Sequence, residues 1–176
     1  MLESLITSRT RLKMLLKFFI NSNSTAYLRG MAEEFGESTN AIRHELNNLA
    51  NASYLISEEN GRTIQYRANI KHPLYTEIQK LIHKYLGFDK IVDQILAKLG
   101  KLYYAFIIGD YAVGKDSGSI ELVLVGEIDT VYLRKCVKKV EKLINRKIST
   151  EVMSLEIFKK QKHQFIDSAL VMWSDK

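Results

Sequence analysis

Apolar residues in the first part of the chain recur at the three- and four-residue intervals of helices that bury one face. Ser8 precedes the first such segment as a helix cap, and a second, shorter helix is expected over residues 28–35. The first segment carries its apolar side chains at Leu12, Leu15, Leu16 and Phe19. This pattern predicts two helices that share a common core.

A third amphipathic segment follows the turn at Gly36, and its two faces differ in chemistry. Ser38 is a suitable N-cap, and Ile42, Leu46 and Leu49 form the apolar stripe. On a helical wheel of roughly 100° per residue, amide, guanidinium and imidazole groups point away from that stripe. They belong to Asn40, Arg43, His44 and Asn47. Because such groups donate and accept at base edges, the segment is predicted to be the second helix of a helix-turn-helix, presented to the DNA major groove.

Two short strands are expected after this helix, over residues 54–57 and 63–67. Asn60 and Gly61 lie between them, and this pair suits a type I′ turn because both residues tolerate a positive φ. A helix-turn-helix followed by a hairpin is a winged helix, which is the fold predicted for the first part of the chain.

A long amphipathic segment then begins at His72, with Pro73 at the first helical position. Its apolar stripe is longer than a small domain needs and consists of Leu74, Ile78, Leu81, Ile82 and Tyr85. We therefore expect this helix to contact a second copy of the chain or the next domain. The domain boundary is placed after Leu86, which gives domains over residues 1–86 and 87–176.

Strand and helix patterns alternate in the remainder of the chain. The continuous apolar run from Leu102 to Ile108 is bounded by glycines and is typical of a buried strand. The other expected elements are strands over 119–125 and 147–154, helices over 88–99, 130–145 and 155–165, a loop over 110–118 and a closing segment over 170–173. The fold class predicted for the whole chain is α+β, a winged helix-turn-helix followed by a small α/β domain.

Composition narrows the function classes only modestly. The net charge of +6 is divided evenly, with 11 Lys/Arg against 8 Asp/Glu up to Leu86 and 15 against 12 after it. The positive charge favours an acidic partner, but it is not concentrated on the candidate recognition helix. Because Cys136 is the one cysteine, a disulfide framework and a cysteine-based zinc site are excluded, and no metal or cofactor is predicted. The apolar runs are too short to cross a bilayer and no signal peptide is evident, so a cytoplasmic protein without a membrane partner is expected.

The first part of the chain resembles the ArsR-like winged-helix transcription regulators over most of residues 5–86. The matching positions are Ser8-Arg9-Thr10-Arg11 before Leu15-Leu16, Tyr27-Leu28-Arg29 with Ala32 and Phe35, Asn40 to Leu49, Gly61-Arg62, Tyr66, Asn69 and His72-Pro73-Leu74. The resemblance implies a transcriptional regulator that binds double-stranded DNA as a homodimer.

The second part resembles a minimal nucleotidyltransferase domain. The matching positions are Gly109-Asp110, Ala112, Gly114 and Gly118-Ser119-Ile120-Glu121-Leu122. In active members of that family, two Asp side chains hold the magnesium that bridges the nucleotide phosphates, and a Ser contacts a phosphate. Ser119 and Glu121 stand at the two Asp positions, and Asp110 stands at the Ser position. A Ser hydroxyl is a poor magnesium ligand and Asp110 would repel a phosphate, so the resemblance predicts the fold without the activity.

This second domain is therefore expected to be no enzyme, to have no catalytic residues, and to serve dimerisation or the sensing of a small-molecule or nucleotide ligand. Glu151, on the next expected strand, is the only nearby candidate for a further carboxylate. The glycines at 109 and 114 also have a simpler interpretation as residues of a loop that needs backbone freedom.

Within the winged helix, the hydrogen-bonding chemistry of bases and phosphates assigns expected roles to individual side chains. Arg43 is the best candidate for a guanine edge, and Asn40 or Asn47 for adenine, with His44 on the same face. Ser38 and Thr39 suit phosphate contacts at the helix N-terminus. The alternative for these residues is an ordinary solvated helix face. Arg62, at the wing tip, could enter a minor groove or touch phosphate, or could be a simple exposed turn residue.

Two other functions remain as alternatives. The second domain could be a nucleotidyltransferase that acts on a protein or small molecule and uses Glu121 with a displaced carboxylate. The winged helix could instead bind a protein, which the salt dependence of binding would distinguish from DNA binding. The operator, the direction of regulation, the inducing ligand and the regulated genes leave no signal in the sequence.

Overall fold

The chain divides into two compact units, Met1–Ile82 and His83–Lys176. The structure is a computed structural model, and it describes residues 2–96, 99–166 and 169–174. The division falls inside a helix, α5 (Tyr75–Leu86), four residues before the boundary that the sequence predicts. Each unit has its own sheet and its own buried core.

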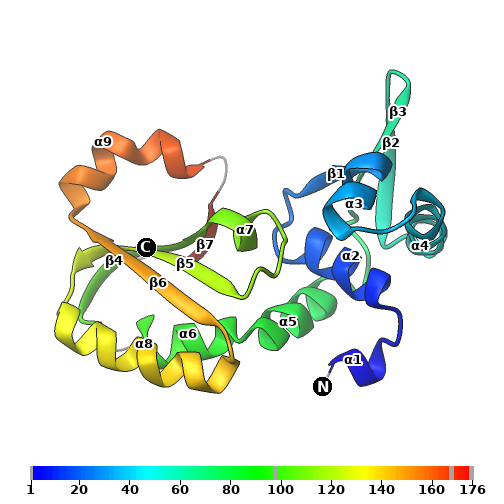
Figure 1. Cartoon of the computed structure of the whole chain (residues 1–176). Coiled ribbons are helices and arrows are strands. Elements are labelled where there is room, and N and C mark those ends of the chain that lie inside the picture. The colour runs from blue at the N-terminus through cyan, green and yellow to red at the C-terminus, as the bar shows by residue number, and fades with distance from the viewer. Residues whose placement is uncertain (1, 97–98, 167–168, 175–176) are drawn as a thin grey trace. The chain divides into compact units, whose positions relative to one another are not determined.

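Unit 1 combines helices with a small antiparallel sheet (Figure 1). Its elements are α1 (Leu2–Leu5), α2 (Arg9–Phe19), β1 (Thr25–Tyr27), α3 (Leu28–Phe35), α4 (Thr39–Asn51), β2 (Leu55–Asn60) and β3 (Thr63–Ala68), followed by the start of α5. The strand order is β1-β3-β2, and both pairings are antiparallel. Strands β2 and β3 form the projecting hairpin, and α3 and α4 form the helix-turn-helix before it.

The core of unit 1 forms where the apolar stripes of α2 and α4 meet. Phe18 and Met14 of α2 and Ile42 and Leu46 of α4 are fully buried. The N-caps predicted from the sequence are present, since Ser8 accepts a hydrogen bond from the Arg11 backbone N–H at 3.2 Å and Ser38 accepts one from Ala41 at 3.2 Å. These caps fix where α2 and α4 begin, and so fix which face of α4 points outward.

The hairpin turn differs from the predicted type I′ turn. Asn60 pairs with Thr63, so the two central turn residues are Gly61 and Arg62 rather than Asn60 and Gly61. Gly61 has φ +61°, and Arg62 is not among the residues with positive φ. Glycine at the first central position with an ordinary second residue is the pattern of a type II′ turn, which suits a right-twisted hairpin equally well.

The start of α5 also differs from the prediction. Helix α5 begins at Tyr75, so Pro73 lies in the preceding turn and not at the first helical position. His72 holds that turn, because its Nδ1 accepts from the Leu74 backbone N–H at 3.1 Å and its carbonyl accepts from Tyr75 at 2.9 Å. The prediction that Pro73 occupies the first helical position is therefore wrong, and the hydrogen bonds accepted by His72 shape the turn before α5.

Unit 2 is a four-stranded mixed sheet covered by helices. Its elements after α5 are α6 (Phe88–Gln94), β4 (Lys101–Ile108), α7 (Gly109–Ala112), β5 (Ser119–Glu127), α8 (Thr130–Ile144), β6 (Lys147–Met153), α9 (Leu155–Ile166) and β7 (Leu170–Ser174). The strand order is β6-β5-β4-β7, with β5 and β6 parallel and the other pairs antiparallel. Helix α8, capped by Asp129 as predicted, makes the crossover between the two parallel strands.

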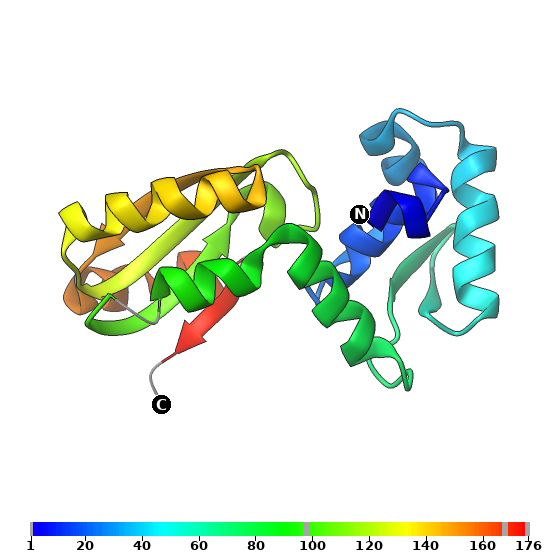
Figure 2. The ribbon, with the colours of Figure 1, turned by 90° about the horizontal axis from the view of Figure 1, so that it is seen from below.

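Helices cover both faces of this sheet. Figure 1 shows α9 on one face and α6 and α8 on the other, and Figure 2 shows α6 and α8 side by side. On the α9 face, Phe158 packs against Phe106, Val123, Val125 and Met153. The α+β class predicted from the sequence is confirmed. In the part of the chain that the structure describes, no helix is long and apolar enough to cross a membrane.

Two element predictions in unit 2 need correction. Helix α6 ends at Gln94, whereas the apolar spacing predicted a helix to residue 99, and residues 97 and 98 of that prediction lie outside the described residues. The predicted loop over 110–118 begins with the short helix α7, whose tyrosine, Tyr111, is fully buried. The buried side chain of Tyr111 anchors this segment. The polar residues around it led to the prediction of an exposed loop.

Candidate functional site

One face of α4 brings together the four side chains predicted to contact bases. Asn40, Arg43, His44 and Asn47 are all exposed, opposite the buried Ile42, Leu46 and Leu49. The Arg43 guanidinium donates one long hydrogen bond, 3.4 Å, to the Asn40 side-chain oxygen. The face therefore offers amide, guanidinium and imidazole groups that are free to bond to a partner.

The N-terminus of α4 places backbone N–H groups beside this face. Ser38 caps the helix by accepting the Ala41 backbone N–H at its side-chain oxygen, and its O–H can still donate to an outside partner. Thr39, the first helical residue, is exposed, and the first N–H groups of a helix have no partner within the helix. Such groups favour a phosphate, which supports the role predicted for Ser38 and Thr39.

Arg62 stands exposed at the tip of the β2–β3 hairpin. None of the ion pairs among the described residues involves it. Of the two acidic residues that precede it, Glu58 pairs with Arg67 at 2.5 Å, whereas Glu59 is exposed. One of the two negative charges near Arg62 is thus compensated within the hairpin, which lowers the repulsion that a phosphate at the tip would meet.

Lys13 and Lys17 of α2 are bonded within unit 1. Lys13 donates to the Phe35 carbonyl at 2.8 Å and pairs with Glu37 at 3.3 Å, while Lys17 pairs with Glu34 at 2.9 Å. These contacts tie α2 to the end of α3 and to the turn before α4. Lys13 and Lys17 therefore hold the helix-turn-helix together, whereas the exposed cations of unit 1 include Arg9, Arg43 and Arg62.

Glu45 is a structural residue that the sequence pattern did not single out. It is buried, with a relative exposure of 7%, on the inner side of α4. Its carboxylate accepts from the Ser8 hydroxyl at 2.8 Å and from Arg11 Nε at 2.9 Å. Burial raises the pKa of the Glu45 carboxyl, but the hydrogen bonds from Ser8 and Arg11 outweigh it and leave the pKa below its usual value. Glu45 thereby fixes α4 against the start of α2. In the sequence, the only signal for this role is a charged residue on the inner side of an amphipathic helix.

We predict that Glu45→Ala destabilises unit 1 by about 1 to 3 kcal/mol, because two hydrogen bonds to a charged, buried acceptor are lost. Glu33→Ala, which removes an exposed glutamate of α3, is the matched control and should change stability by less than about 0.5 kcal/mol. Urea unfolding followed by circular dichroism measures both variants. Equal stability of the two variants would contradict the role given to Glu45.

In unit 2, the residues of the nucleotidyltransferase-like motif lie around the end of β4 and the start of β5. Gly109 has φ +67°, a backbone conformation that favours glycine, and the Glu121 carboxylate lies against it. Asp110 pairs with Lys115 at 3.5 Å, which compensates the negative charge expected to repel a phosphate. Ser119 and Glu121 are exposed on β5, whereas Gly114 is buried with φ +82°.

A cavity of about 140 Å³ opens beside Glu121. Its lining includes Glu151 of β6 together with Ser149 and Thr150. The parallel register pairs Glu121 with Ser149 and Val123 with Glu151, so the two glutamates are on the same face of neighbouring strands. The structure thus brings together two carboxylates that the sequence could not place relative to each other.

A buried polar cluster holds the segment between α7 and β5. Arg146 pairs with Asp116 at 2.6 Å and donates to the Tyr111 hydroxyl at 3.0 Å, and Tyr111 donates to Asp116 and accepts from the Gly118 backbone N–H. Burial raises the pKa of Asp116, but the hydrogen bonds from Arg146 and Tyr111 outweigh it and hold that pKa below its usual value. Burial, with the Asp116 charge, raises the pKa of Tyr111 well above its usual value. The cluster is a scaffold, because its polar groups are bonded to one another.

Comparison with known proteins gives likenesses of fold only. No protein-family model matches the chain, and no curated protein matches it. Reduced HlyU from Vibrio cholerae N16961 is 16% identical, with 47% of this chain and 82% of that chain covered and a TM-score of 0.38. The tri-AMPylated Shewanella oneidensis HEPN toxin in complex with MNT antitoxin is 13% identical, with coverages of 51% and 71% and a TM-score of 0.37. A crystal structure of a toxin–antitoxin with AMP-PNP is 14% identical, with coverages of 51% and 74% and a TM-score of 0.40.

These matches contradict the prediction that the chain is not an enzyme, and we withdraw that prediction. The similar structures include a toxin–antitoxin with AMP-PNP and an AMPylated toxin with its MNT antitoxin. The prediction relied on Asp110 and Ser119, and it gave no weight to Glu151, which the sheet places on the same face as Glu121. Membership of the ArsR-like family stays a prediction.

Proposed function

We propose that the protein is a transcriptional regulator that binds double-stranded DNA through α4 and the β2–β3 wing. The observation that carries the proposal is the exposed face of α4, where Asn40, Arg43, His44 and Asn47 are clustered and make no strong contact with the rest of unit 1. Side chains of this kind on the second helix of a helix-turn-helix read base edges in the major groove. The helix N-terminus and Arg62 would add phosphate contacts that set the orientation of the protein on the duplex.

We further propose that the regulator acts as a homodimer. Leu81 of α5 and Leu74, the residue just before α5, remain 40% and 48% exposed, and Ile78 of α5 is half-buried. Exposed leucines at this spacing favour a helix–helix contact with a second copy. Sedimentation of the full chain at micromolar concentration should give a dimer, and a monomer would contradict the proposal.

Selection from a pool of random duplexes tests DNA binding without knowledge of the operator. The full chain should enrich a recurrent motif, and for a dimer this motif should be two-fold symmetric, with half-sites about one helical turn apart. Failure to enrich any sequence, under conditions where a known winged-helix regulator enriches its own site, would contradict the proposed function.

A second candidate function rests on the two carboxylates of unit 2. Glu121 and Glu151 line one cavity, and magnesium in nucleotide sites is commonly held by one or two carboxylates together with the substrate phosphates. Glu121 and Glu151 would hold such an ion, which would supply Lewis-acid stabilisation of phosphate charge during nucleotidyl transfer to a protein or small molecule. Among the described residues no cluster of three or more His, Cys, Asp or Glu side chains is placed to hold a metal ion, so these two residues would carry the site.

Calorimetry of the full chain with ATP, with and without magnesium, tests this candidate. Magnesium-dependent binding should be lost in Glu121→Gln and kept in Glu127→Gln, which removes an exposed glutamate at the far end of the same strand. Binding that both variants retain would place the nucleotide elsewhere, and absence of binding by the wild type would eliminate this function.

A further inference from the structure

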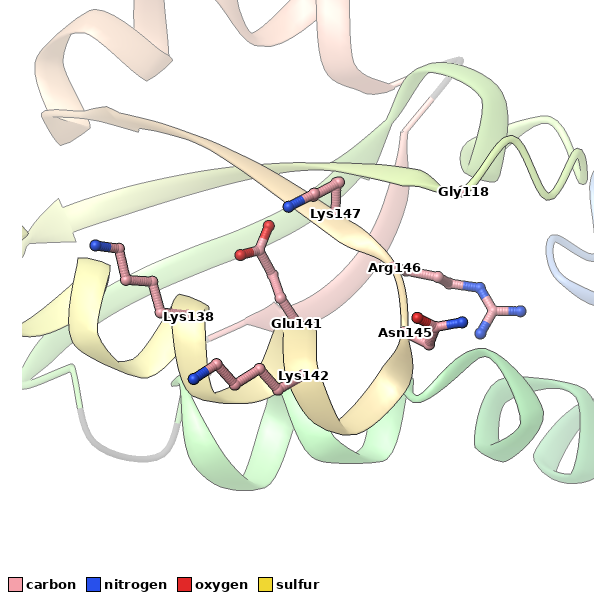
Figure 3. A pocket seen from close by; sticks show the side chains of 7 residues that line it. All are labelled: Gly118, Lys138, Glu141, Lys142, Asn145, Arg146 and Lys147. Atoms are coloured by element: carbon pink, nitrogen blue, oxygen red, sulfur yellow. The ribbon is translucent and has the colours of Figure 1, made fainter.

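A basic cleft lies on unit 2 between the end of α8 and the start of β6, and Gly118 is the one residue of the nucleotidyltransferase-like motif in its lining. Its volume is about 360 Å³. Figure 3 shows its lining, which consists of Lys138, Glu141, Lys142 and Asn145 at the end of α8, Arg146 and Lys147 after it, and Gly118. The functions proposed above make no use of this cleft.

The charge of the cleft comes from three lysines. Lys138, Lys142 and Lys147 are exposed, and none of the ion pairs formed among the described residues involves them. Arg146 points away from them in Figure 3, because its guanidinium is bonded to Asp116 and Tyr111. The cleft therefore carries three uncompensated ammonium groups and an arginine whose charge is neutralised by its own partner.

Glu141 is the acidic residue in the lining, and it is partly engaged. Its Oε1 accepts from the Ile148 backbone N–H at 2.9 Å, which ties the end of α8 to β6. The lysines at 138, 142 and 147 outnumber it, so the lining is net positive even when Glu141 is counted as fully charged.

The positive charge continues along α8 beyond the cleft. Helix α8 carries five basic residues against one acidic residue, and all five are exposed. They are Arg134, Lys135, Lys138, Lys139 and Lys142. A solvent-exposed helix face without a binding partner is stabilised by opposite charges three or four residues apart, whereas like charges at those spacings repel. Here Lys138 has Arg134 and Lys142 four residues away on either side, an arrangement that a bound polyanion would stabilise.

We propose that this cleft and the adjoining face of α8 bind the phosphate backbone of a nucleic acid, giving unit 2 a sequence-independent contact with DNA. The inference rests on the proposed function and extends it to the second unit. An extended polyanion fits better than a free nucleotide because the cations run along most of α8, which rises about 1.5 Å per residue, and are not confined to the cleft. Each lysine would contact the backbone through its ammonium group without reading the bases.

The test compares two full-length variants with the same net charge. Lys138→Gln/Lys142→Gln/Lys147→Gln neutralises the cleft, and Lys159→Gln/Lys160→Gln/Lys162→Gln neutralises three exposed lysines of α9. Binding to a random-sequence duplex is measured across a salt series by fluorescence anisotropy. Log affinity falls with log salt, and each lost phosphate contact makes this slope less steep by about 0.9. We therefore expect the slope of the cleft variant to be less steep by about 2 to 3 and the slope of the α9 variant to be unchanged.

Three outcomes would overturn the inference in distinguishable ways. Equal slopes for the two variants, with wild-type binding intact, would remove the cleft from the DNA contact and leave the proposed function standing. Absence of DNA binding by the wild type would contradict both. Loss of ATP or inorganic triphosphate binding in the cleft variant, with its DNA slope unchanged, would assign the cleft to a small phosphate ligand instead. Thermal unfolding of both variants checks that each remains folded.

Discussion

Replacing Asn40, Arg43 and Asn47 together by alanine should abolish most of the preference for a selected DNA site over random DNA. Each base pair read through a well-placed side chain contributes about 1 to 3 kcal/mol of discrimination, which is on the order of 10- to 100-fold in relative affinity. Because the three side chains are exposed and make at most one weak contact with one another, their loss should leave the stability of unit 1 unchanged. Competition binding between the selected site and a scrambled duplex measures the effect.

A matched variant separates base contacts from general charge. Arg9→Ala/Asn23→Ala removes an exposed arginine and an exposed asparagine from the start of α2 and from the segment before β1. This variant should keep the preference for the selected site, even where its total affinity falls slightly. If both variants lost the preference equally, α4 would not be the element that reads the sequence.

Replacing Arg146 by methionine should be the most destabilising single substitution outside the apolar cores, at about 3 to 5 kcal/mol. The Arg146 side chain is 12% exposed and the Asp116 side chain 20%, so the change leaves a carboxylate largely buried without its cationic partner. It also removes a donor to Tyr111 and the contact of the guanidinium with the Tyr85 ring. Trp173, the one tryptophan of the chain, lies in β7 of unit 2, so its fluorescence in a urea titration follows this unit.

The matched control is Arg134→Met, the same substitution at an exposed position of α8, where the change should stay within about 0.5 kcal/mol. A loss below about 1 kcal/mol in Arg146→Met would contradict the scaffold role of the cluster.

The effect of Arg146→Met should also depend on pH. In the folded protein the pKa of Asp116 lies below its usual value, so the pair stabilises the protein above the unfolded pKa of about 4, and this contribution is lost as the pH falls through the folded value. In the variant, burial without Arg146 would raise the pKa of Asp116, so the difference in free energy of unfolding between the wild type and Arg146→Met should be largest near neutral pH and should shrink on acidification. A difference that grew on acidification would contradict the assignment of the lowered pKa to Arg146.

The sequence predicts the helices and strands of unit 1 well because each has a local signal. Ser38 caps α4, and the spacing of Ile42, Leu46 and Leu49 fixes which face of α4 points outward. The hairpin turn is predicted one residue out of place, since Asn60-Gly61 and Gly61-Arg62 are both acceptable turn pairs and the strand register decides between them. Local patterns set the elements, and tertiary pairing sets their ends.

The candidate sites of unit 2 depend on contacts that no local pattern contains. Glu121 and Glu151 become neighbours only through the parallel pairing of β5 and β6. Arg146 follows the lysines of α8 closely in the sequence, but its guanidinium pairs with the largely buried Asp116. Arg146 and Asp116 are 30 residues apart in the sequence, so local periodicity cannot predict that they pair. It therefore cannot distinguish this structural arginine from the lysines of the cleft.

Sequence recognition by α4 is tested most directly by the affinity of the full chain for DNA from upstream of its own gene, compared with a scrambled duplex of the same length across a salt series. We expect log affinity to fall linearly with log salt for both duplexes and the upstream DNA to be preferred at every salt concentration. Equal affinity for the two duplexes, or no binding of either at low salt, would contradict sequence recognition by α4.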